Sequence, residues 1–242
     1  MKWSSINYLK IDFLKNPALI LFCLASLIYI LAGVYERELF VLISKSLVVP
    51  SILLYYIQSC KKIELHVLVL YGFFFTGDII MITNPENSLS WIIVIYIIGY
   101  LLIFYSVITE LKKEKDTKIS KNKIYNIIVL MFTYLFIYFQ FIDFIFDFNF
   151  EYKPLYLLAS IILLLLSITI TISCVLQMSI KKWLLILAIL MIVISNFVFV
   201  CHIYYVEVDS LYFWSLITQS FFYFFLINYY LINNKKEATP NE

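Results

Sequence analysis

The sequence predicts an all-α membrane protein: one bundle of eight transmembrane helices spanning residues 1–242, with both termini in the cytoplasm. Three observations predict this fold. Hydrophobic residues make up 63% of the chain and charged residues only 14%, whereas soluble domains carry about 25% charged residues. The apolar residues form long runs without a period of two, which favours helices over a β-barrel. Lysine and arginine residues are also distributed very unequally between alternate loops.

Each apolar run is close to the ~20 residues that a helix needs to cross a ~30 Å hydrocarbon core. Only helices satisfy their own backbone polar groups in such a run, so a helical bundle follows. The runs place the helices at residues 17–34, 39–57, 65–82, 89–108, 124–146, 155–178, 183–205 and 211–232. The connections are short, and the longest, residues 110–123, is expected to be a solvated loop.

The basic residues give the orientation. Fifteen of the 18 lysines and arginines fall in the N-terminal segment, the second, fourth and sixth loops and the C-terminal tail. The alternate loops contain only Arg37 and Lys153, and Lys45 lies inside the second span. Cytoplasmic loops are enriched in lysine and arginine, so both termini are predicted to be cytoplasmic. The expected location is a bacterial inner membrane, which the chain crosses several times.

Several classes of site are not expected. The net charge of +2 is too small to indicate nucleic-acid binding. The four cysteines have no CxxC spacing, so neither disulfides nor a zinc site is predicted. The first apolar run has no small-residue cleavage site and further spans follow it, so a cleaved signal peptide is not expected. No cofactor or metal is predicted.

Few polar residues lie inside the spans, and such residues tend to mark functional sites because they are costly in a bilayer. Lys45 is about six residues from the start of its span, a depth of roughly 9 Å. The predicted topology puts the whole set in the outer half or near the midplane, and leaves the inner half nearly free of such groups. A polar cavity opening toward the outer face, or toward lipid in the outer leaflet, is therefore expected. The set consists of Lys45, Asp78, Gln140, Asp143, Asn196, His202 and Gln219.

Each of these residues also has a purely structural interpretation. Lys45 can extend its ammonium group toward the membrane surface, or it can pair with Asp78 as part of the packing. Asp143 lies close enough to a helix end to be solvated. His202 can serve as a hydrogen-bonded residue between helices, and the many Tyr and Phe residues as packing and interfacial belts.

Four short motifs carry a resemblance to a known family. The second span contains Lys45-Ser46-Leu47, the third Gly77-Asp78 before an apolar stretch, the seventh Ser195-Asn196, and the eighth Gln219 followed by Tyr223. With eight spans, this arrangement resembles the YhhN-like lysoplasmalogenase membrane family. The chain departs from that family in three places. Asn196 stands where an acid is expected, no histidine follows Phe104 in the fourth span, and the glutamine of the eighth span is shifted.

The resemblance implies hydrolysis of the vinyl-ether bond of a lysophospholipid, which gives a fatty aldehyde and a glycerophospho-alcohol. It implies Asp78, Lys45 and Asn196 as catalytic residues. Residues implied to bind the substrate are His202, Gln219, Tyr223 and Asp143. Lys45 would favour the ionised form of Asp78, which suits a base or a group that stabilises a cation. Asn196 would orient water, and Asp143 would replace the missing acid if the fifth span packs beside the third.

Two other classes of function stay open. One is a catalytically inactive protein of the same fold that binds lipid or has a structural role, which the absent acid and histidine favour. The other is a small transporter, although paired halves and Gly- or Pro-broken spans, which are typical of transporters, are not evident. The lipid head group and the oligomeric state are left open by the sequence.

Overall fold

A computed structural model of the chain describes residues 16–83, 85–113, 121–146, 152–176, 179–204 and 209–237. These residues form eight α-helices. The helices are α1 (Pro17–Val34), α2 (Glu38–Ser59), α3 (Leu65–Thr83), α4 (Pro85–Lys113), α5 (Lys121–Phe146), α6 (Lys153–Leu176), α7 (Ile180–Tyr204) and α8 (Asp209–Glu237). The predicted all-α fold is confirmed.

Within the described residues, seven helices are long and apolar enough to cross a membrane; α5 contributes a shorter apolar segment, Ile124–Gln140. Many large apolar side chains of these helices are exposed on the outside of the bundle, among them Leu24, Leu27 and Phe132. Lipid tails can cover such a surface but water would not, so the chain is a multi-pass integral membrane protein.

The predicted loop at residues 110–123 is shorter than expected. Helix α4 continues to Lys113 and α5 already begins at Lys121. The end of α4 stays helical because the Glu110 carboxylate has partners on two neighbouring helices, Lys181 on α7 and Tyr229 on α8. Glu110, the charged residue at which the predicted loop begins, is therefore not the end of α4.

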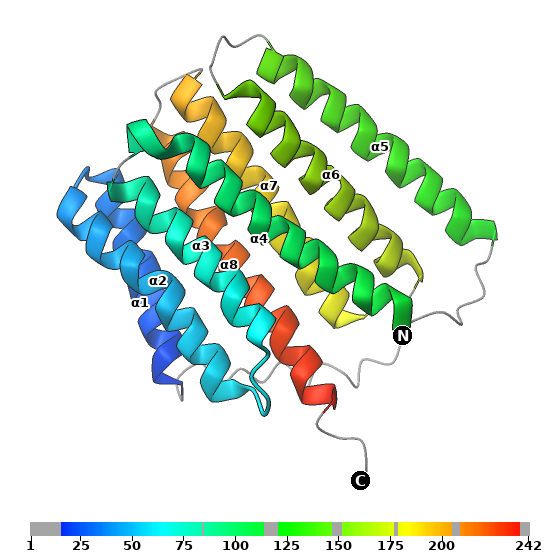
Figure 1. The fold of residues 1–242 in the computed structure, drawn as a ribbon, viewed down its shortest axis with the longest axis horizontal. Helices are drawn as coiled ribbons and strands as arrows, with labels where there is room; N and C mark the ends of the chain where they lie inside the picture. Colours follow the sequence, from blue (N-terminus) through cyan, green and yellow to red (C-terminus); the bar gives the residue numbers. More distant parts are fainter. Residues whose placement is uncertain are drawn as a thin grey trace.

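The helices are arranged side by side, with α1 and α2 at one edge of the bundle and α5 at the other (Figure 1). Helix α8 packs against α7, α1 and α2, whereas α6 bridges α4, α5 and α7. The peripheral position of α5 leaves α6 as its main neighbour (Figure 1). The bundle thus has a tightly packed part around α8 and a looser part around α5 and α6.

Small residues let helices approach closely in the packed part. Ser195 on α7 and Ser215 on α8 donate hydrogen bonds to each other's backbone carbonyl oxygens, at 3.1 and 3.3 Å. An added Cβ at Gly99 would lie 2.7 Å from the ring of Phe74, so this glycine lets α3 and α4 pack against each other. Such contacts are the usual basis of helix association in membranes.

Candidate functional site

The carboxylate of Asp78 on α3 is the centre of a buried polar cluster. Its Oδ2 accepts a hydrogen bond of 2.7 Å from the hydroxyl of Tyr223 on α8. Its Oδ1 accepts one of 3.0 Å from the amide nitrogen of Gln219 and another from the hydroxyl of Tyr96 on α4. Lys45 on α2 places its ammonium nitrogen 3.5 Å from Oδ1. We call Lys45, Asp78, Tyr96, Gln219 and Tyr223 the Asp78 cluster.

Burial makes this cluster electrostatically strong. Asp78 is 1% exposed and Lys45 is 4% exposed, so neither charge is screened by water. Each charge has the opposite charge beside it, and the carboxylate has three neutral donors in addition. The Lys45 ammonium group also lies 5.2 Å from the centre of the Tyr29 ring on α1, a favourable cation–π contact. The cluster therefore links α2, α3, α4 and α8, and the contact with Tyr29 adds α1.

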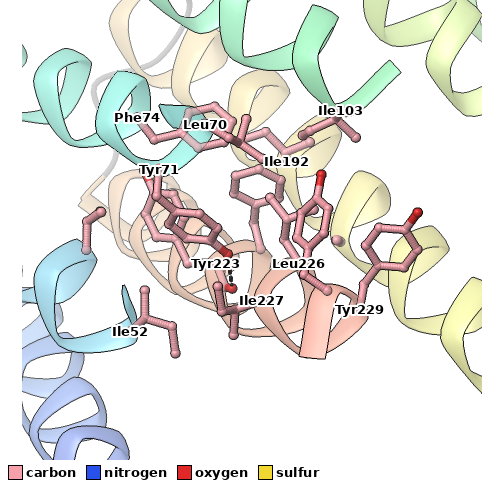
Figure 2. Packing of buried hydrophobic residues seen from close by; sticks show 14 of the residues in the cluster. Ile52, Leu70, Tyr71, Phe74, Ile103, Ile192, Tyr223, Leu226, Ile227 and Tyr229 are labelled. Atoms are coloured by element: carbon pink, nitrogen blue, oxygen red, sulfur yellow. Dashed lines mark hydrogen bonds between the residues drawn. The ribbon is translucent and has the colours of Figure 1, made fainter. Parts of the chain in front are cut away.

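An aromatic layer holds the cluster in place. The ring of Phe74, one turn before Asp78 on α3, contacts the rings of Tyr71, Tyr96, Tyr100, Phe222 and Tyr223. Tyr71 also donates a hydrogen bond of 2.9 Å to the backbone oxygen of Tyr223, drawn as the dashed line in Figure 2. Aromatic pairs of this kind each add about 0.5–1.5 kcal/mol beyond their burial. The donors to Asp78 are thus fixed by packing as well as by hydrogen bonds.

Four residues predicted from the sequence meet in this cluster: Lys45, Asp78, Gln219 and Tyr223. The catalytic and substrate-binding roles assigned to them remain predictions. The polar cavity that the sequence predicted around these residues is not found within the described ranges; they form a closed, buried cluster. Lys45 and Asp78 are almost completely covered by protein, and neither lines the cavity described below.

Asn196, which the sequence assigned to the same site as Asp78, bonds to a different residue. Its amide nitrogen donates a hydrogen bond of 3.0 Å to the hydroxyl of Tyr100 on α4. The Tyr100 ring stacks on that of Tyr96, with ring centres 6.4 Å apart, and Tyr96 bonds to Asp78. Two tyrosines therefore connect Asn196 to the carboxylate, without direct contact.

Among the remaining predicted residues, His202 does not join the cluster. His202 lies near the end of α7, where its ring is 5.4 Å from that of Tyr212 on α8. Its buried Nδ1 has no hydrogen-bond partner among the described residues. Asp143 belongs to α5, but its side chain lies outside the described residues. Helix α5 packs mainly on α6 rather than beside α3, so the condition for Asp143 to replace the missing acid is not met.

A cavity of about 730 Å³ lies on the other side of Asn196, between α5, α6 and α7. We call it the lateral cavity. Its lining is mostly apolar, and three lining side chains, Leu190, Val193 and Phe197, are also exposed on the bundle surface. The cavity therefore opens toward the surrounding membrane. Its polar lining residues are Tyr134, Tyr138, Gln140, Ser160, Ser167, Thr171 and Asn196.

The lateral cavity is elongated along the helices. On α6 its lining extends from Ser160 to Thr171, eleven residues or about 16 Å along the helix axis. This is about half of the ~30 Å hydrocarbon core of a bilayer. The two amide side chains, Gln140 and Asn196, lie toward the C-terminal ends of α5 and α7, and Ser160 lies toward the N-terminal end of the antiparallel α6. The amides thus gather at one end of the cavity.

Most hydroxyl groups in the lining are already bonded within the protein. Ser167 donates to the backbone oxygen of Leu163 at 2.7 Å, and Ser160 donates to that of Leu157 at 2.8 Å. Thr171 and Tyr134 form a 3.0 Å hydrogen bond with each other. The middle and the far end of the cavity therefore present chiefly hydrocarbon to an occupant.

A second ion pair, between a buried lysine and a partly buried glutamate, was missed by the sequence analysis. Glu110 on α4 bonds to Lys181 on α7, and the Tyr229 hydroxyl donates to Glu110 at 2.7 Å. The Lys181 ammonium group also lies 4.8 Å from the centre of the Tyr229 ring. This pair lies at the opposite end of α4 from Pro85. The expectation that the lysine-rich half of the bundle carries almost no buried polar groups is therefore wrong.

No group of three or more His, Cys, Asp or Glu side chains that could hold a metal ion is found in the part of the chain that the structure describes. Comparison with known proteins gives no relative: no family model matches the chain, and no curated protein or solved structure was found that resembles it.

Proposed function

We propose that this membrane protein binds a single-chain amphiphilic lipid, of the lysophospholipid class, in the lateral cavity. The observation that carries the proposal is the shape and chemistry of that cavity. Its volume of about 730 Å³ is within the usual range of small-molecule sites, about 300–1,000 Å³. It is apolar over about 16 Å and polar at one end, as a chain with a head group requires.

A single acyl chain fits these dimensions better than a two-chain lipid does. The cavity is bounded by three helices and extends over about half of the hydrocarbon core, which is the depth of one leaflet. Its exposed rim, formed in part by Leu190 and Phe197, gives a lipid a lateral entry route from the bilayer. The resemblance noted in the sequence names the same class of ligand.

Photo-crosslinking tests the binding proposal. The purified protein in nanodiscs would be incubated with a lysophosphatidylcholine that carries a diazirine in its acyl chain, irradiated, and digested. We expect labelled peptides from α6 and α7, and loss of the label when unlabelled lysophosphatidylcholine is added. Labels spread over the exposed surfaces of all helices, in proportion to their exposure, would contradict a specific site.

A second candidate function is hydrolysis of a lysoplasmalogen. The observation that favours it is the meeting of Lys45, Asp78, Gln219 and Tyr223, which three of the four sequence motifs suggested. The reaction would begin with transfer of a proton from a hydronium ion of the medium to the β-carbon of the vinyl ether. Water would then add to the oxocarbenium ion, and the resulting hemiacetal would break down to a fatty aldehyde and the glycerophospho-alcohol.

The residues of the Asp78 cluster have defined roles in that reaction. The Asp78 carboxylate, paired with Lys45, would stabilise the cation or accept a proton from the attacking water. Asn196, at the edge of the lateral cavity, would orient that water. The structure supports lipid binding better than hydrolysis, because the Asp78 carboxylate is buried beneath its hydrogen-bond donors whereas the lateral cavity is open.

Aldehyde release from a lysoplasmalogen tests the hydrolase directly. Release that falls strongly in Asp78→Asn protein that still takes the displaceable photo-crosslinking label would support it. Equal release from the wild type and Asp78→Asn would remove Asp78 from the reaction. No release from the wild type would leave the lipid-binding function without catalysis.

We further propose that α5 also crosses the membrane, which brings the number of spans to eight. We propose in addition that both termini face the cytoplasm of a bacterial cell. The lysine-rich loops and the apolar segment of α5 support this topology. In a cysteine-free variant, Asp116→Cys should be labelled only after the membrane is permeabilised. Tyr35→Cys should be labelled in intact cells, and the reverse pattern would contradict the orientation.

A further inference from the structure

The amide of Asn196 faces two environments, and its two polar atoms are used differently. Its Nδ2 donates to the Tyr100 hydroxyl at 3.0 Å. Its Oδ1 accepts no hydrogen bond from any residue that the structure describes, although Asn196 is one of the residues that line the lateral cavity. This oxygen is not among the buried polar atoms that lack a partner. It is therefore accessible from the cavity.

Neighbouring residues hold the Asn196 side chain between Tyr100 and the lateral cavity. Ser195, next in the chain, is held against Ser215 of α8 by reciprocal hydrogen bonds. Tyr100, which receives the Asn196 amide, is 2% exposed and is packed between Phe74 and Tyr96. The nitrogen is thus committed to the protein interior, and the oxygen remains for an occupant of the cavity.

We infer that Asn196 is a specificity-determining residue whose amide oxygen accepts a hydrogen bond from a hydroxyl group of the bound lipid. This inference rests on the proposed lipid-binding function and extends it, because it names the group of the lipid that the site recognises. An accepting oxygen selects a donor, so the site discriminates a lipid with a free hydroxyl beside its chain from one whose hydroxyl is blocked.

The other polar groups of the lining differ from the Asn196 oxygen in burial or in the bonds they already make. The hydroxyls of Ser160, Ser167 and Thr171 are already bonded to backbone oxygens or to Tyr134. Gln140, the other amide in the lining, is exposed at the same end. Asn196 lies at the polar end of an otherwise apolar lining, so the ligand hydroxyl is expected close to the start of the acyl chain.

Competition for the photo-crosslinking label tests the inference. The competitors are 1-acyl-lysophosphatidylcholine with a free 2-hydroxyl and its 2-O-methyl ether, which has the same chain and head group. We expect the free hydroxyl compound to compete about 10-fold better in the wild type, as the loss of one hydrogen bond predicts. In Asn196→Leu the two competitors should become equal, at the weaker value.

Two variants separate specificity from folding. Ser167→Ala also changes a cavity-lining polar residue, but its hydroxyl is already bonded to Leu163, so the preference of about 10-fold should persist there. Asn196→Asp keeps an accepting oxygen and should also retain a preference for the free hydroxyl. Equal competition by both lipids in the wild type would overturn the inference while leaving lipid binding intact. Failure of both lipids to compete would overturn the binding proposal as well.

Discussion

The ammonium nitrogen of Lys45 on α2 lies 3.5 Å from a carboxylate oxygen of Asp78 on α3, and both side chains are almost fully buried. The two charges differ in how they are supported. The carboxylate has three further donors, Tyr96, Gln219 and Tyr223, whereas the contacts described for Lys45 are Asp78 and the Tyr29 ring. Removing the Asp78 charge should therefore destabilise the protein more than removing the Lys45 charge.

We expect Asp78→Asn to destabilise the protein more than Lys45→Met does. Asp78→Asn leaves a buried ammonium group without a counter-charge, which costs about 3–5 kcal/mol in known cases. Lys45→Met leaves a carboxylate that still accepts three hydrogen bonds. The double variant should be more stable than Asp78→Asn alone. The free energy of unfolding of the wild type, the two single variants and the double variant would be measured in mixed micelles of increasing SDS content. A loss of stability in the double variant equal to the sum of the two single losses would contradict the pairing.

Tyr223→Phe should cost more stability than Tyr230→Phe, although both tyrosines are buried on α8. The Tyr223 hydroxyl donates to the charged Asp78 carboxylate at 2.7 Å, whereas that of Tyr230 donates to the neutral Ser106 hydroxyl at 3.3 Å. Hydrogen bonds to charged groups contribute about 1.5–3 kcal/mol and neutral ones about 0.5–1.5 kcal/mol. The same SDS unfolding experiment measures both variants. Losses of equal size would show that Tyr223 does not support the carboxylate.

Two glycines near the cluster should respond in opposite ways to an added methyl group. At Gly99 the new Cβ would lie 2.7 Å from the ring of Phe74, which is fully buried and cannot move freely. Such overpacking typically costs about 1–3 kcal/mol. At Gly77 the nearest atoms are 3.4 Å away, an ordinary contact, and alanine also favours the helix by up to about 1 kcal/mol.

Thermal unfolding in detergent compares the two glycine variants. Gly99→Ala should unfold at a lower temperature than the wild type, and Gly77→Ala at the same or a higher temperature. A wild-type unfolding temperature for Gly99→Ala would mean that α3 and α4 do not pack as closely as described.

Part of the candidate site was predictable from the sequence, because charged and amide residues are rare in apolar spans. Lys45, Asp78 and Gln219 were singled out on that ground and do meet. Tyr96 and Tyr100 were missed because the chain has 20 tyrosines and 22 phenylalanines, so a tyrosine pair spaced by four residues looks like ordinary packing. Only the fold shows that their hydroxyls face Asp78 and Asn196.

The Glu110–Lys181 pair was missed for a different physical reason. Hydropathy places the end of a span where charged residues begin, so both residues were assigned to solvated connections. In the structure each charge neutralises the other and Tyr229 bonds to Glu110, so the helices carry these charges into the packed bundle. The lateral cavity was likewise not predictable, because it depends on how far α5 lies from α7.

The hydrolase hypothesis makes a prediction at Asn196, where the resemblance inferred from the sequence implies an acid. Asn196→Asp introduces a second carboxyl group, connected to Asp78 through Tyr100 and Tyr96, and two acids in different environments can divide the acid and base roles. We expect aldehyde release from lysoplasmalogen to rise about 10-fold or more, since a positioned general acid contributes about 10²–10⁴-fold. Asp78→Asn added to this variant should abolish the gain.

An unchanged rate in Asn196→Asp, in protein that still binds the lipid, would count against hydrolysis. The lipid-binding function would then stand without catalysis.

The central claim is that the lateral cavity holds a lipid chain, and two adjacent leucines on α6 test it most directly. Leu164 lines the cavity, whereas Leu165 is exposed on the bundle surface and is not part of the lining. Tryptophan at either position adds the same bulk to the same helix. The measurement is the displaceable photo-crosslinking of diazirine lysophosphatidylcholine in nanodiscs. We predict a large loss in Leu164→Trp and wild-type labelling in Leu165→Trp; equal labelling of the two variants would contradict the account.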